Sequence, residues 1–543
     1  MGIRTTMESA LHGARRSPGQ PASRSRVSHR VAVGALTVLV AAGYCAFALI
    51  RYDTFQTSSY DLVIFDQAVR SYAHFMPGIS IIKGVHNGFG PDFSVLGDHW
   101  SPIIAVLAPL YWIYDAPQTL LVAQAVLFAL AIPPLWLFTR RALGGGPGKA
   151  TVAAYLVSVA YALSWPIAGA LAFDFHEVAF VPVLTAVALE RLQAGRLRPA
   201  LIALAALLLV KEDMGLLVAG IGLYLAVSRP LVARQRLVAL TLVVAGLAAT
   251  FIATYVLVPA LGGRSGYYWA YTALGHNLSQ AAGHLIAHPS SWRLLITPHV
   301  KLETVLWLFG AFCFLPLLSP ISLAVVPLLL ERMLANLFPA WWGTSLQYNA
   351  FLVVILLCAA VDGAVRLDRM LARRHRATAP DKSADTTSAR SAAATSTPTV
   401  ALACTAAMCA VAVLLVPRFA FGGALHPSFY HRDAQEKATA AADAVVPAGV
   451  TVQAVDNLGP QLSARDTVLL WDGDGYTPPL GAPWIVADTT KLQFTFPSVR
   501  EQRRRVALLE RSGYTVVFAR DGYIVLHRTG PATGAGNSRE ATG

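Results

Sequence analysis

The sequence predicts a mainly helical membrane protein. We expect a bundle of about 11 spans, interfacial helices at its outer face and a small C-terminal α/β domain. Three observations support this. Of 543 residues only 13% are charged, whereas soluble domains carry about 25%, and 55% are hydrophobic with a mean hydropathy of +0.52. Apolar segments of about membrane-spanning length recur along the chain. Near residue 430 the composition changes to that of a soluble domain. An ordinary cytosolic enzyme and a disordered protein are therefore excluded.

The first predicted span is 31–50, after a polar, Arg-rich tail (1–30) that we expect to be cytoplasmic and disordered. Ala46-Phe47-Ala48 mimics a signal-peptide cleavage site, but the apolar run is too long for a signal peptide and many spans follow it. The remaining predicted segments lie within the bundle 31–365 or form the last span, near 117–138, 150–168, 178–190, 199–210, 214–228, 237–258, 303–318, 322–338, 347–364 and 401–416.

Basic residues gather in alternate loops, which predicts a cytoplasmic N-terminus and an extracytoplasmic C-terminal domain. The predicted cytoplasmic loops contain Arg140, Arg141, Lys149, Arg191, Arg196, Arg198, Arg229, Arg234, Arg236, Arg366, Arg369, Arg373, Arg374 and Arg376. This alternation requires 101–114 to be an interfacial helix on the outer face rather than a span. The net charge of +13 is thereby explained by topology. No nucleic acid partner is expected, because no basic face carries interleaved aromatic residues.

The chain after residue 365 is predicted to form four parts. Residues 366–400 are a cytoplasmic disordered linker, 401–416 the last span, 430–528 the α/β domain and 529–543 a disordered tail. In the domain we expect helices at 433–446 and 499–511, strands at 450–455, 467–471 and 484–487, and a closing hairpin of 514–518 with 523–527. The five cysteines all lie in apolar segments, so neither disulfides nor a zinc site is expected.

The long first outer loop, 51–116, contains two carboxylates of interest. Ser58 or Ser59 is expected to cap a helix with Asp61 in its first turn, where a carboxylate can serve the helix dipole alone. Asp66 and Arg70 have the i, i+4 spacing of an ion pair. Five residues turn a helix by about 140°, so both Asp side chains cannot face one site unless Asp61 precedes the helix. We therefore take Asp61 as the first catalytic candidate and Asp66 as the second.

Further polar side chains lie at the predicted outer ends of the spans. Asp174 and His176 are also placed to share a metal ion or a proton, and with Asp61 they are the candidate metal ligands. Simpler interpretations remain open, namely a solvated turn at 173–177 and an internal ion pair for Lys211. The candidate substrate-binding residues are Gln67, His99, Asp174, His176, Glu177, Lys211, Glu212, Lys301, Arg332 and Gln347.

These motifs resemble, as a set, a bacterial family of predicted membrane proteins catalogued as domain-of-unknown-function family 2079. They are Asp61-Leu-x-Ile-Phe-Asp66-Gln67, His99-x-Ser-Pro102, Phe173-Asp174-Phe175-His176 and Lys211-Glu212-Asp213. The similarity covers roughly residues 35–370, and the domain after 430 also fits. The family has no settled activity.

The architecture is similar to the C-type glycosyltransferases of membranes, which take a sugar from a polyprenyl-phosphate carrier on the outer leaflet. This resemblance implies a carboxylate as general base on the acceptor hydroxyl, a polyprenyl-phosphate-linked sugar donor, a cell-envelope acceptor and often a divalent cation (Mg or Mn). Asp61 occupies the matching place. The chain departs from the commonest pattern because no second acidic residue is adjacent to Asp61.

Three functions compete on the sequence. A lipid-linked sugar transferase requires polar residues clustered on one face. A lipid or solute transporter or flippase requires them on both faces or through the middle, with internal symmetry. A non-catalytic scaffold requires them to be scattered and ion-paired. The clustering is one-sided and no repeat is evident, so a glycosyltransferase is favoured over the other two. No Walker loop or nucleophile elbow is present.

Overall fold

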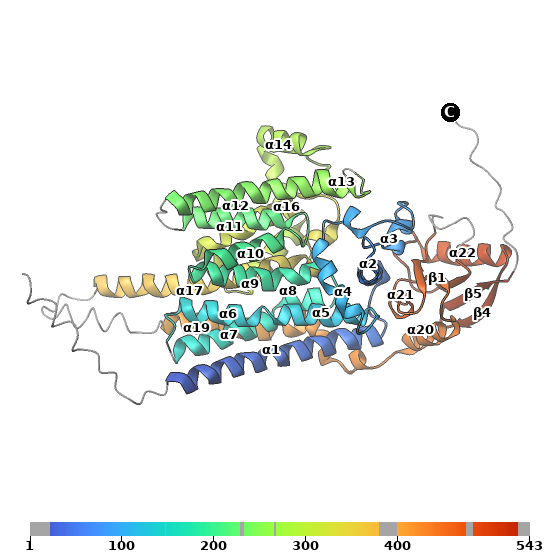
Figure 1. Ribbon diagram of the computed structural model, residues 1–543, viewed down its shortest axis with the longest axis horizontal. Coiled ribbons are helices and arrows are strands. Elements are labelled where there is room, and N and C mark those ends of the chain that lie inside the picture. The colour runs from blue at the N-terminus through green and yellow to red at the C-terminus, as the bar shows by residue number, and fades with distance from the viewer. Residues whose placement is uncertain are drawn as a thin grey trace, which may run out of the picture.

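The computed structural model describes residues 22–146, 148–228, 233–264, 266, 268–378, 399–473 and 482–529. It consists of a helical bundle with a small sheet domain at one end (Figure 1). We call this the sheet-domain end of the bundle. The bundle contains α1 (Ala22–Asp53), α2 (Ile64–Ala73), α3 (Ile81–His86), α4 (Ala108–Tyr111), α5 (Gln118–Ala129), α6 (Ile132–Ala142), α7 (Lys149–Ala162), α8 (Trp165–Leu171), α9 (Phe180–Gln193), α10 (Leu197–Leu207), α11 (Met214–Val227), α12 (Ala233–Ile252), α13 (Val258–Ala260), α14 (Leu278–Ala287), α15 (His299–Gly310), α16 (Val326–Leu334), α17 (Ala350–Thr378) and α19 (Thr399–Leu415).

Six helical stretches among the described residues are long and apolar enough to cross a membrane. They are Ser28–Asp53, Gln118–Ala142, Lys149–Ala172, Gln235–Ala260, Gln347–Arg374 and Thr399–Arg418. The predicted count of 11 spans is not confirmed. Several of the other predicted segments are shorter helices, such as α10 with 11 residues and α11 with 14, and a full span needs about 20.

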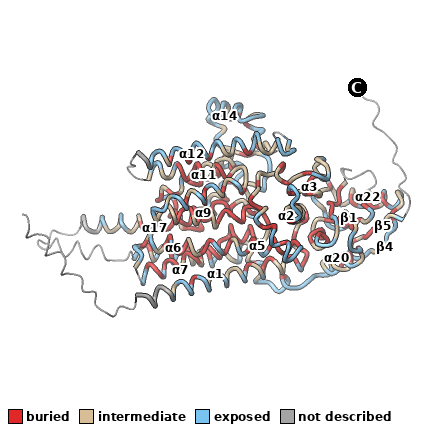
Figure 2. Tube along the Cα trace, viewed as in Figure 1, coloured by how far each residue is buried: buried red, intermediate tan, exposed pale blue. Residues whose placement is uncertain are grey.

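The long helix α17 forms the centre of the bundle. Of its most apolar 18-residue window, 83% is buried, against 22% for the corresponding windows around α12 and α19. Figure 2 shows this contrast between buried inner helices and exposed outer ones. A helix that is apolar all round belongs in the interior, whereas the exposed apolar faces of α12 and α19 are suited to lipid.

Close helix packing in the bundle depends on small residues. A Cβ built on Gly215 of α11 would lie 2.1 Å from the Gly246 carbonyl oxygen of α12, and one on Gly246 would lie 2.4 Å from the Gly215 oxygen. The two backbones therefore approach as in other membrane helix pairs with small residues at the interface.

The sheet domain has five strands in the order β2-β1-β3-β5-β4. Its strands are β1 (Thr451–Ala454), β2 (Thr467–Leu470), β3 (Trp484–Asp488), β4 (Tyr514–Arg520) and β5 (Tyr523–Arg528). The strands β2, β1 and β3 are parallel, while β5 and β4 form the antiparallel hairpin that the sequence predicts. The accompanying helices are α20 (Ala434–Val445), α21 (Gly459–Leu462) and α22 (Val499–Arg511).

Two sequence-based boundaries need correction. The predicted linker 366–400 begins too early, because α17 continues to Thr378 through a run of Arg, Leu and Ala residues with high helix propensity. The predicted tail 1–30 ends too late, because α1 begins at Ala22. The remaining parts of these segments, 1–21 and 379–398, and most of the predicted tail, 530–543, lie outside the described residues.

The segment 101–114 is broken by Pro102 and Pro109 into a 3-10 helix (Pro102–Leu107) followed by α4. The apolar side chains of Val106, Trp112 and Ile113 remain exposed there. This is the form expected of an interfacial element rather than of a span.

Candidate active site

Polar side chains from four loops and α3 meet at the sheet-domain end of the bundle. His176 Nε2 lies 3.3 Å from Asp61 Oδ1, Lys211 Nζ lies 2.8 Å from Glu177 Oε1, and His99 Nδ1 lies 2.8 Å from Glu212 Oε1. His176 and Glu177 are adjacent in the chain, as are Lys211 and Glu212. The three ion pairs therefore form one continuous series.

The series closes on itself through α3. Asp98, the neighbour of His99, pairs with Lys83 Nζ at 3.0 Å, and Lys83 Nζ also lies 3.2 Å from the hydroxyl of Tyr60, the neighbour of Asp61. We call the whole set the polar ring, and it consists of Tyr60, Asp61, Lys83, Asp98, His99, His176, Glu177, Lys211 and Glu212. Four carboxylates alternate in it with four basic groups.

Local structure fixes the Asp61 side of the ring. Ser58 caps the short helical turn Ser59–Val63 by accepting from the Tyr60 N–H, and Asp61 lies in the first turn, as the sequence predicts. Because this turn precedes α2, Asp61 points to the ring while Asp66 on α2 does not. The Asp61 side chain is 26% exposed, against 0% for Asp66. Of these two carboxylates, only Asp61 is exposed to solvent.

The opposite wall of the ring is the turn between α8 and α9. The His176 N–H donates to Gln124 Oε1 at 3.1 Å, and the Gln124 amide donates to the Asp174 carbonyl. Phe173 stacks on the His176 ring with centroids 5.1 Å apart. The backbone of Asp174 has a φ of +48°. Residues other than glycine adopt such an angle only when the surrounding structure enforces it.

Asp174 connects this turn to the sheet domain through Ser58. Its Oδ2 accepts from the Ser58 N–H at 2.7 Å, and the Ser58 hydroxyl donates to Asp456, which follows β1, at 2.9 Å. Asp456 also accepts from the Tyr60 N–H at 3.1 Å. A Cβ on Gly459 would lie 2.1 Å from Ser59 Oγ, so glycine is needed for this close contact. The sheet domain thus helps to hold the turn that carries Asp61.

The charges of the ring control which groups are ionised. Burial raises the pKa of Asp61, but the charges of His176 and Lys83 outweigh it and hold that pKa below its usual value. Burial lowers the pKa of His176, but Asp61 raises it by more, so this pKa lies above its usual value. At neutral pH Asp61 is therefore a carboxylate, with the imidazole of His176 beside it.

Two neighbouring carboxyl groups behave differently. Burial raises the pKa of Asp174 to about 8, opposed by the Ser58 N–H and the Arg51 charge. Burial also raises the pKa of Asp213, next to Glu212, to about 7. Within the described residues, His176 Nδ1 and Glu177 Oε2 are buried and have no hydrogen-bond partner. Buried polar atoms usually have a partner, and these two are left without one.

Several predicted site residues lie outside the ring. Asp66 is held by Arg70 at 2.6 Å and by the Tyr111 hydroxyl at 2.8 Å. Gln67 bridges two elements, since it accepts from the Ile82 N–H and donates to the Val468 carbonyl. These contacts are structural.

The two basic candidates later in the chain are also occupied. Lys301 Nζ donates to the carbonyls of Leu294, Met333 and Ala335. Arg332 donates to the Trp341 and Tyr348 carbonyls and to Asn349. Gln347 is buried, and among the described residues none of these three forms a hydrogen bond or ion pair with the polar ring.

The sequence analysis missed Lys83, Asp98 and Tyr60 as ring members. A usable signal was present, because the chain has only seven lysines among 43 basic residues. Lys83 and Lys211 are two of them, and both lie in the ring. Lys83 stands alone between apolar residues and glycine, where a charged side chain requires a partner.

The expected divalent cation stays a prediction. The described residues contain no group of three or more His, Cys, Asp or Glu side chains that could hold one. Of the three candidate ligands, Asp61 is engaged by His176 and Asp174 by Ser58.

The comparisons with known proteins establish the family. The model of the family described as "Predicted membrane protein (DUF2079)" matches residues 51–525. The chain belongs to this family. The expected membership is thereby confirmed, and the protein is a membrane protein. No curated protein matches the chain.

Two solved structures resemble the chain at low identity. One is ArnT from Cupriavidus metallidurans bound to undecaprenyl phosphate, with a TM-score of 0.46, 12% identity and coverage of 91% of this chain and 99% of that one. The other is the oligosaccharyltransferase AglB from Archaeoglobus fulgidus in complex with an inhibitory peptide and a dolichol-phosphate, with a TM-score of 0.32, 12% identity and coverage of 91% and 74%. Both are glycosyl or oligosaccharyl transferases. TM-scores below 0.5 do not establish a shared fold, so the function has to be argued from the site.

Proposed function

We propose that the protein is a membrane glycosyltransferase that moves a sugar from a polyprenyl-phosphate donor to a cell-envelope acceptor at the polar ring. The observation that carries this proposal is the accessible Asp61 carboxylate, ionised at neutral pH and held against His176. A positioned carboxylate is what sugar transfer to a hydroxyl requires as a general base. The architectural resemblance to C-type glycosyltransferases suggests the lipid-linked donor.

The chemistry follows from the side chains of the ring. Asp61 accepts the proton of the acceptor hydroxyl as its oxygen forms a bond to the anomeric carbon. The bond from that carbon to the phosphate oxygen breaks on the opposite side, and the polyprenyl phosphate leaves with the electron pair. A single general base of this kind gives inversion at the anomeric carbon.

Lys211 is suited to the leaving phosphate. Its ammonium group has three N–H donors, and among the described residues one of them is used, on Glu177. Positive charge placed where a leaving group becomes negative lowers the barrier.

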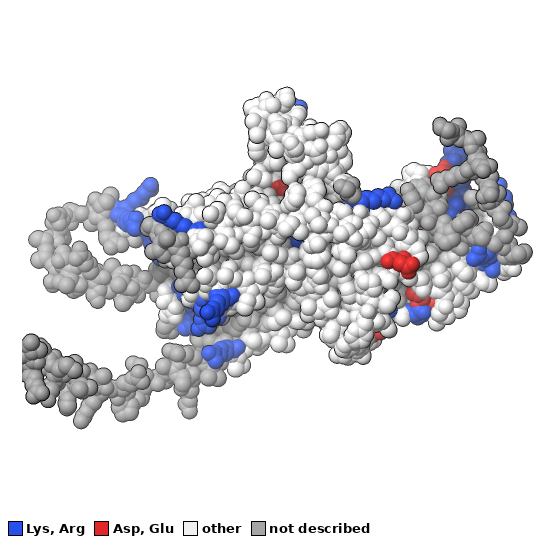
Figure 3. All heavy atoms as spheres, turned by 45° about the horizontal axis from the view of Figure 1, so that its top comes forward, with Lys and Arg blue, Asp and Glu red and all other residues white. Residues whose placement is uncertain are grey.

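The proposed orientation puts the ring outside the cytoplasm. Figure 3 shows Lys and Arg side chains gathered at the bundle end away from the sheet domain. That end includes Arg140 and Arg141 at the end of α6 and Arg191 in the last turn of α9. Basic ends of membrane helices usually face the cytoplasm. The acidic and histidine side chains of the ring lie at the other end, so the arrangement favours transfer at one face over transport through the bundle.

The experiment is a transfer assay with the full chain in proteoliposomes and radiolabelled polyprenyl-phosphate sugars. Asp61→Asn should lower the transfer rate by about 10²–10⁴-fold while the protein remains folded and abundant. The matched control is Asp92→Asn, an exposed carboxylate in the same loop, which should keep wild-type activity. Full activity of Asp61→Asn would remove Asp61 from the mechanism.

A further inference from the structure

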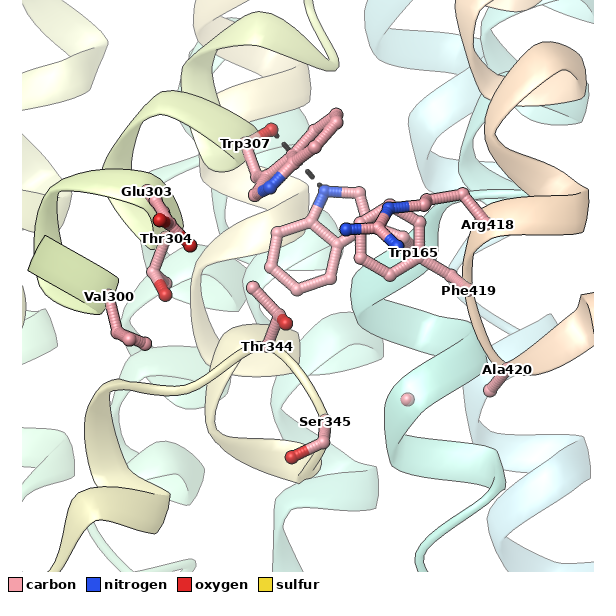
Figure 4. Close-up of a pocket in the computed structure, with 11 residues that line it drawn as sticks. Trp165, Val300, Glu303, Thr304, Trp307, Thr344, Ser345, Arg418, Phe419 and Ala420 are labelled. Atoms are coloured by element: carbon pink, nitrogen blue, oxygen red, sulfur yellow. Dashed lines mark hydrogen bonds between the residues drawn. The ribbon is translucent and has the colours of Figure 1, made fainter.

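A pocket of about 360 Å³ lies apart from the polar ring, between α15, α8 and the chain that follows α19 (Figure 4). This volume is within the range of small-ligand sites. Figure 4 shows Glu303 on α15 at one side and Arg418 at the other. Thr344 and Ser345 line the pocket between them. A cation and an anion thus face the same space.

The two charges do not neutralise each other. In the described part of the chain Glu303 and Arg418 form no ion pair together, and Arg418 has no carboxylate partner. Glu303 has one contact, with the exposed His299 at 3.4 Å. The hydroxyls of Thr344 and Ser345 have no hydrogen-bond partner among the described residues, whereas Thr304 donates its hydroxyl to the Trp342 carbonyl. The pocket therefore offers a cation with no carboxylate partner and a carboxylate whose one ion-pair partner is an exposed histidine.

The wall of the pocket between these charges is aromatic. Trp165 stacks on Phe419 with centroids 5.0 Å apart, and Trp307 meets Phe419 edge-on at 5.5 Å. The Trp165 indole N–H donates to the Trp307 carbonyl. Tryptophan rings of this kind are enriched where membrane meets water.

A second, apolar cavity of about 530 Å³ continues from the pocket and shares Glu303, Trp307 and Arg418 with it. It follows one face of each helix. On α15 it is lined at Glu303, Leu306, Trp307, Gly310 and Ala311, which recur at helical spacing, and on α19 and the turn after it at Val411, Leu415 and Arg418. Eight residues of helix span about 12 Å. A narrow apolar groove of this length, joined to a charged pocket, has the shape of a site for an acyl chain and its headgroup.

We propose that this groove binds a zwitterionic phospholipid whose headgroup carries a phosphate and an ammonium group. Arg418 binds the phosphate, Glu303 binds the ammonium, and the acyl chain lies between α15 and α19. Glu303 distinguishes between classes of lipid, because an anionic lipid would bring its negative charge beside a carboxylate that Arg418 does not pair with. A polyprenyl phosphate carries no cation for Glu303, so this site is distinct from that of the proposed donor and does not depend on the transferase activity.

Native mass spectrometry of the full chain in detergent tests the proposal, with phosphatidylethanolamine and phosphatidylglycerol titrated in competition. We expect wild-type protein to retain phosphatidylethanolamine preferentially. Glu303→Gln should remove the preference while phosphatidylglycerol still binds. Arg418→Gln should weaken both lipids by roughly tenfold. Arg293→Gln, an exposed arginine before α15, is the control and should change neither.

A third variant tests the apolar groove for the acyl chain without changing a charged residue. A Cβ on Gly310 would meet only the Phe314 ring at 3.7 Å. The Gly310→Leu variant should therefore still fold, and its larger side chain should fill the groove. It should weaken both phospholipids equally. Equal binding of the two lipids to wild type would overturn the proposal. So would preferential displacement by polyprenyl phosphate, or a preference that survives Glu303→Gln.

Discussion

At the scale of single residues, the division of labour among the carboxyl groups rests on their contacts. Asp61 has a cationic partner, some exposure and a lowered pKa, while Asp66 is buried against Arg70 and Tyr111. Asp174 is buried with a raised pKa and holds a backbone N–H. The three aspartates therefore have different roles. Asp61 serves as a base, Asp66 is part of an ion pair, and Asp174 anchors the backbone.

Asp174 yields a stability prediction. Because its pKa is about 8, the group is mainly neutral at pH 7. Asp174→Asn should therefore preserve stability, since the amide oxygen still accepts from Ser58 and Asn tolerates a positive φ. Asp174→Ala leaves the Ser58 N–H without its partner and should cost about 1–3 kcal/mol. Thermal unfolding in detergent at pH 7 would measure both, and equal losses in the two variants would contradict the anchor role.

The same residue predicts how stability depends on pH. Burial raises the pKa of Asp174 from its ordinary 3.8 to about 8, so the folded state holds a proton that the unfolded state releases. Its stabilising contribution is complete below about pH 4 and is lost as the pH rises through 8. Thermal unfolding at pH 5 and pH 8 should show a smaller decline for Asp174→Asn than for wild type.

His176 is expected to set the pH dependence of the transfer reaction. His176→Gln keeps a hydrogen-bonding group but removes the charge that lowers the Asp61 pKa. The pKa of Asp61 should rise, so the acidic limb of the rate profile should move to higher pH. His74→Gln, at the end of α2, should leave the limb in place. An unmoved limb in His176→Gln would mean that Asp61 is not the titrating base.

At the scale of elements, the turn Ser59–Val63 depends on the sheet domain. Ser58, Ser59 and Tyr60 all contact Asp456, and Gly459 permits the approach. Gly459→Ala puts a methyl group against Ser59 Oγ and should cost about 1–3 kcal/mol locally. We expect a reduced transfer rate with unchanged abundance. The control is Gly449→Ala, whose new methyl group meets no atom within 4 Å but which strains a positive φ. Equal activity of the two variants would contradict a dependence of the Ser59–Val63 turn on the sheet domain.

Much of each element could be predicted from local sequence. The Ser58 cap, the Asp66–Arg70 pair and the strands of the sheet domain all involve residues close together in the chain, where spacing determines contact. The closure of the polar ring could not be predicted, because Asp61–His176 and His99–Glu212 join residues more than 100 positions apart. The count of 11 spans is not confirmed, and hydropathy alone does not distinguish a half-length helix from a full span.

At the scale of the whole molecule, the two ends of the bundle differ in chemistry. One end carries the polar ring and the sheet domain, and the other carries the basic ends of α6, α9 and α17 (Figures 1 and 3). This asymmetry is the main reason to favour a reaction at one face. A transport path would need polar groups along the bundle, where the described part of α17 is almost wholly apolar from Ala350 to Val361.

The measurement that tests the central claim most directly is a structure of the full chain with a polyprenyl-phosphate sugar bound, determined in lipid nanodiscs. The proposed function predicts the phosphate within hydrogen-bond distance of Lys211 and the anomeric carbon facing Asp61. A donor whose own phosphate is bound in the groove beside Arg418, or whose sugar is enclosed midway through the bundle, would contradict a transferase site at the polar ring.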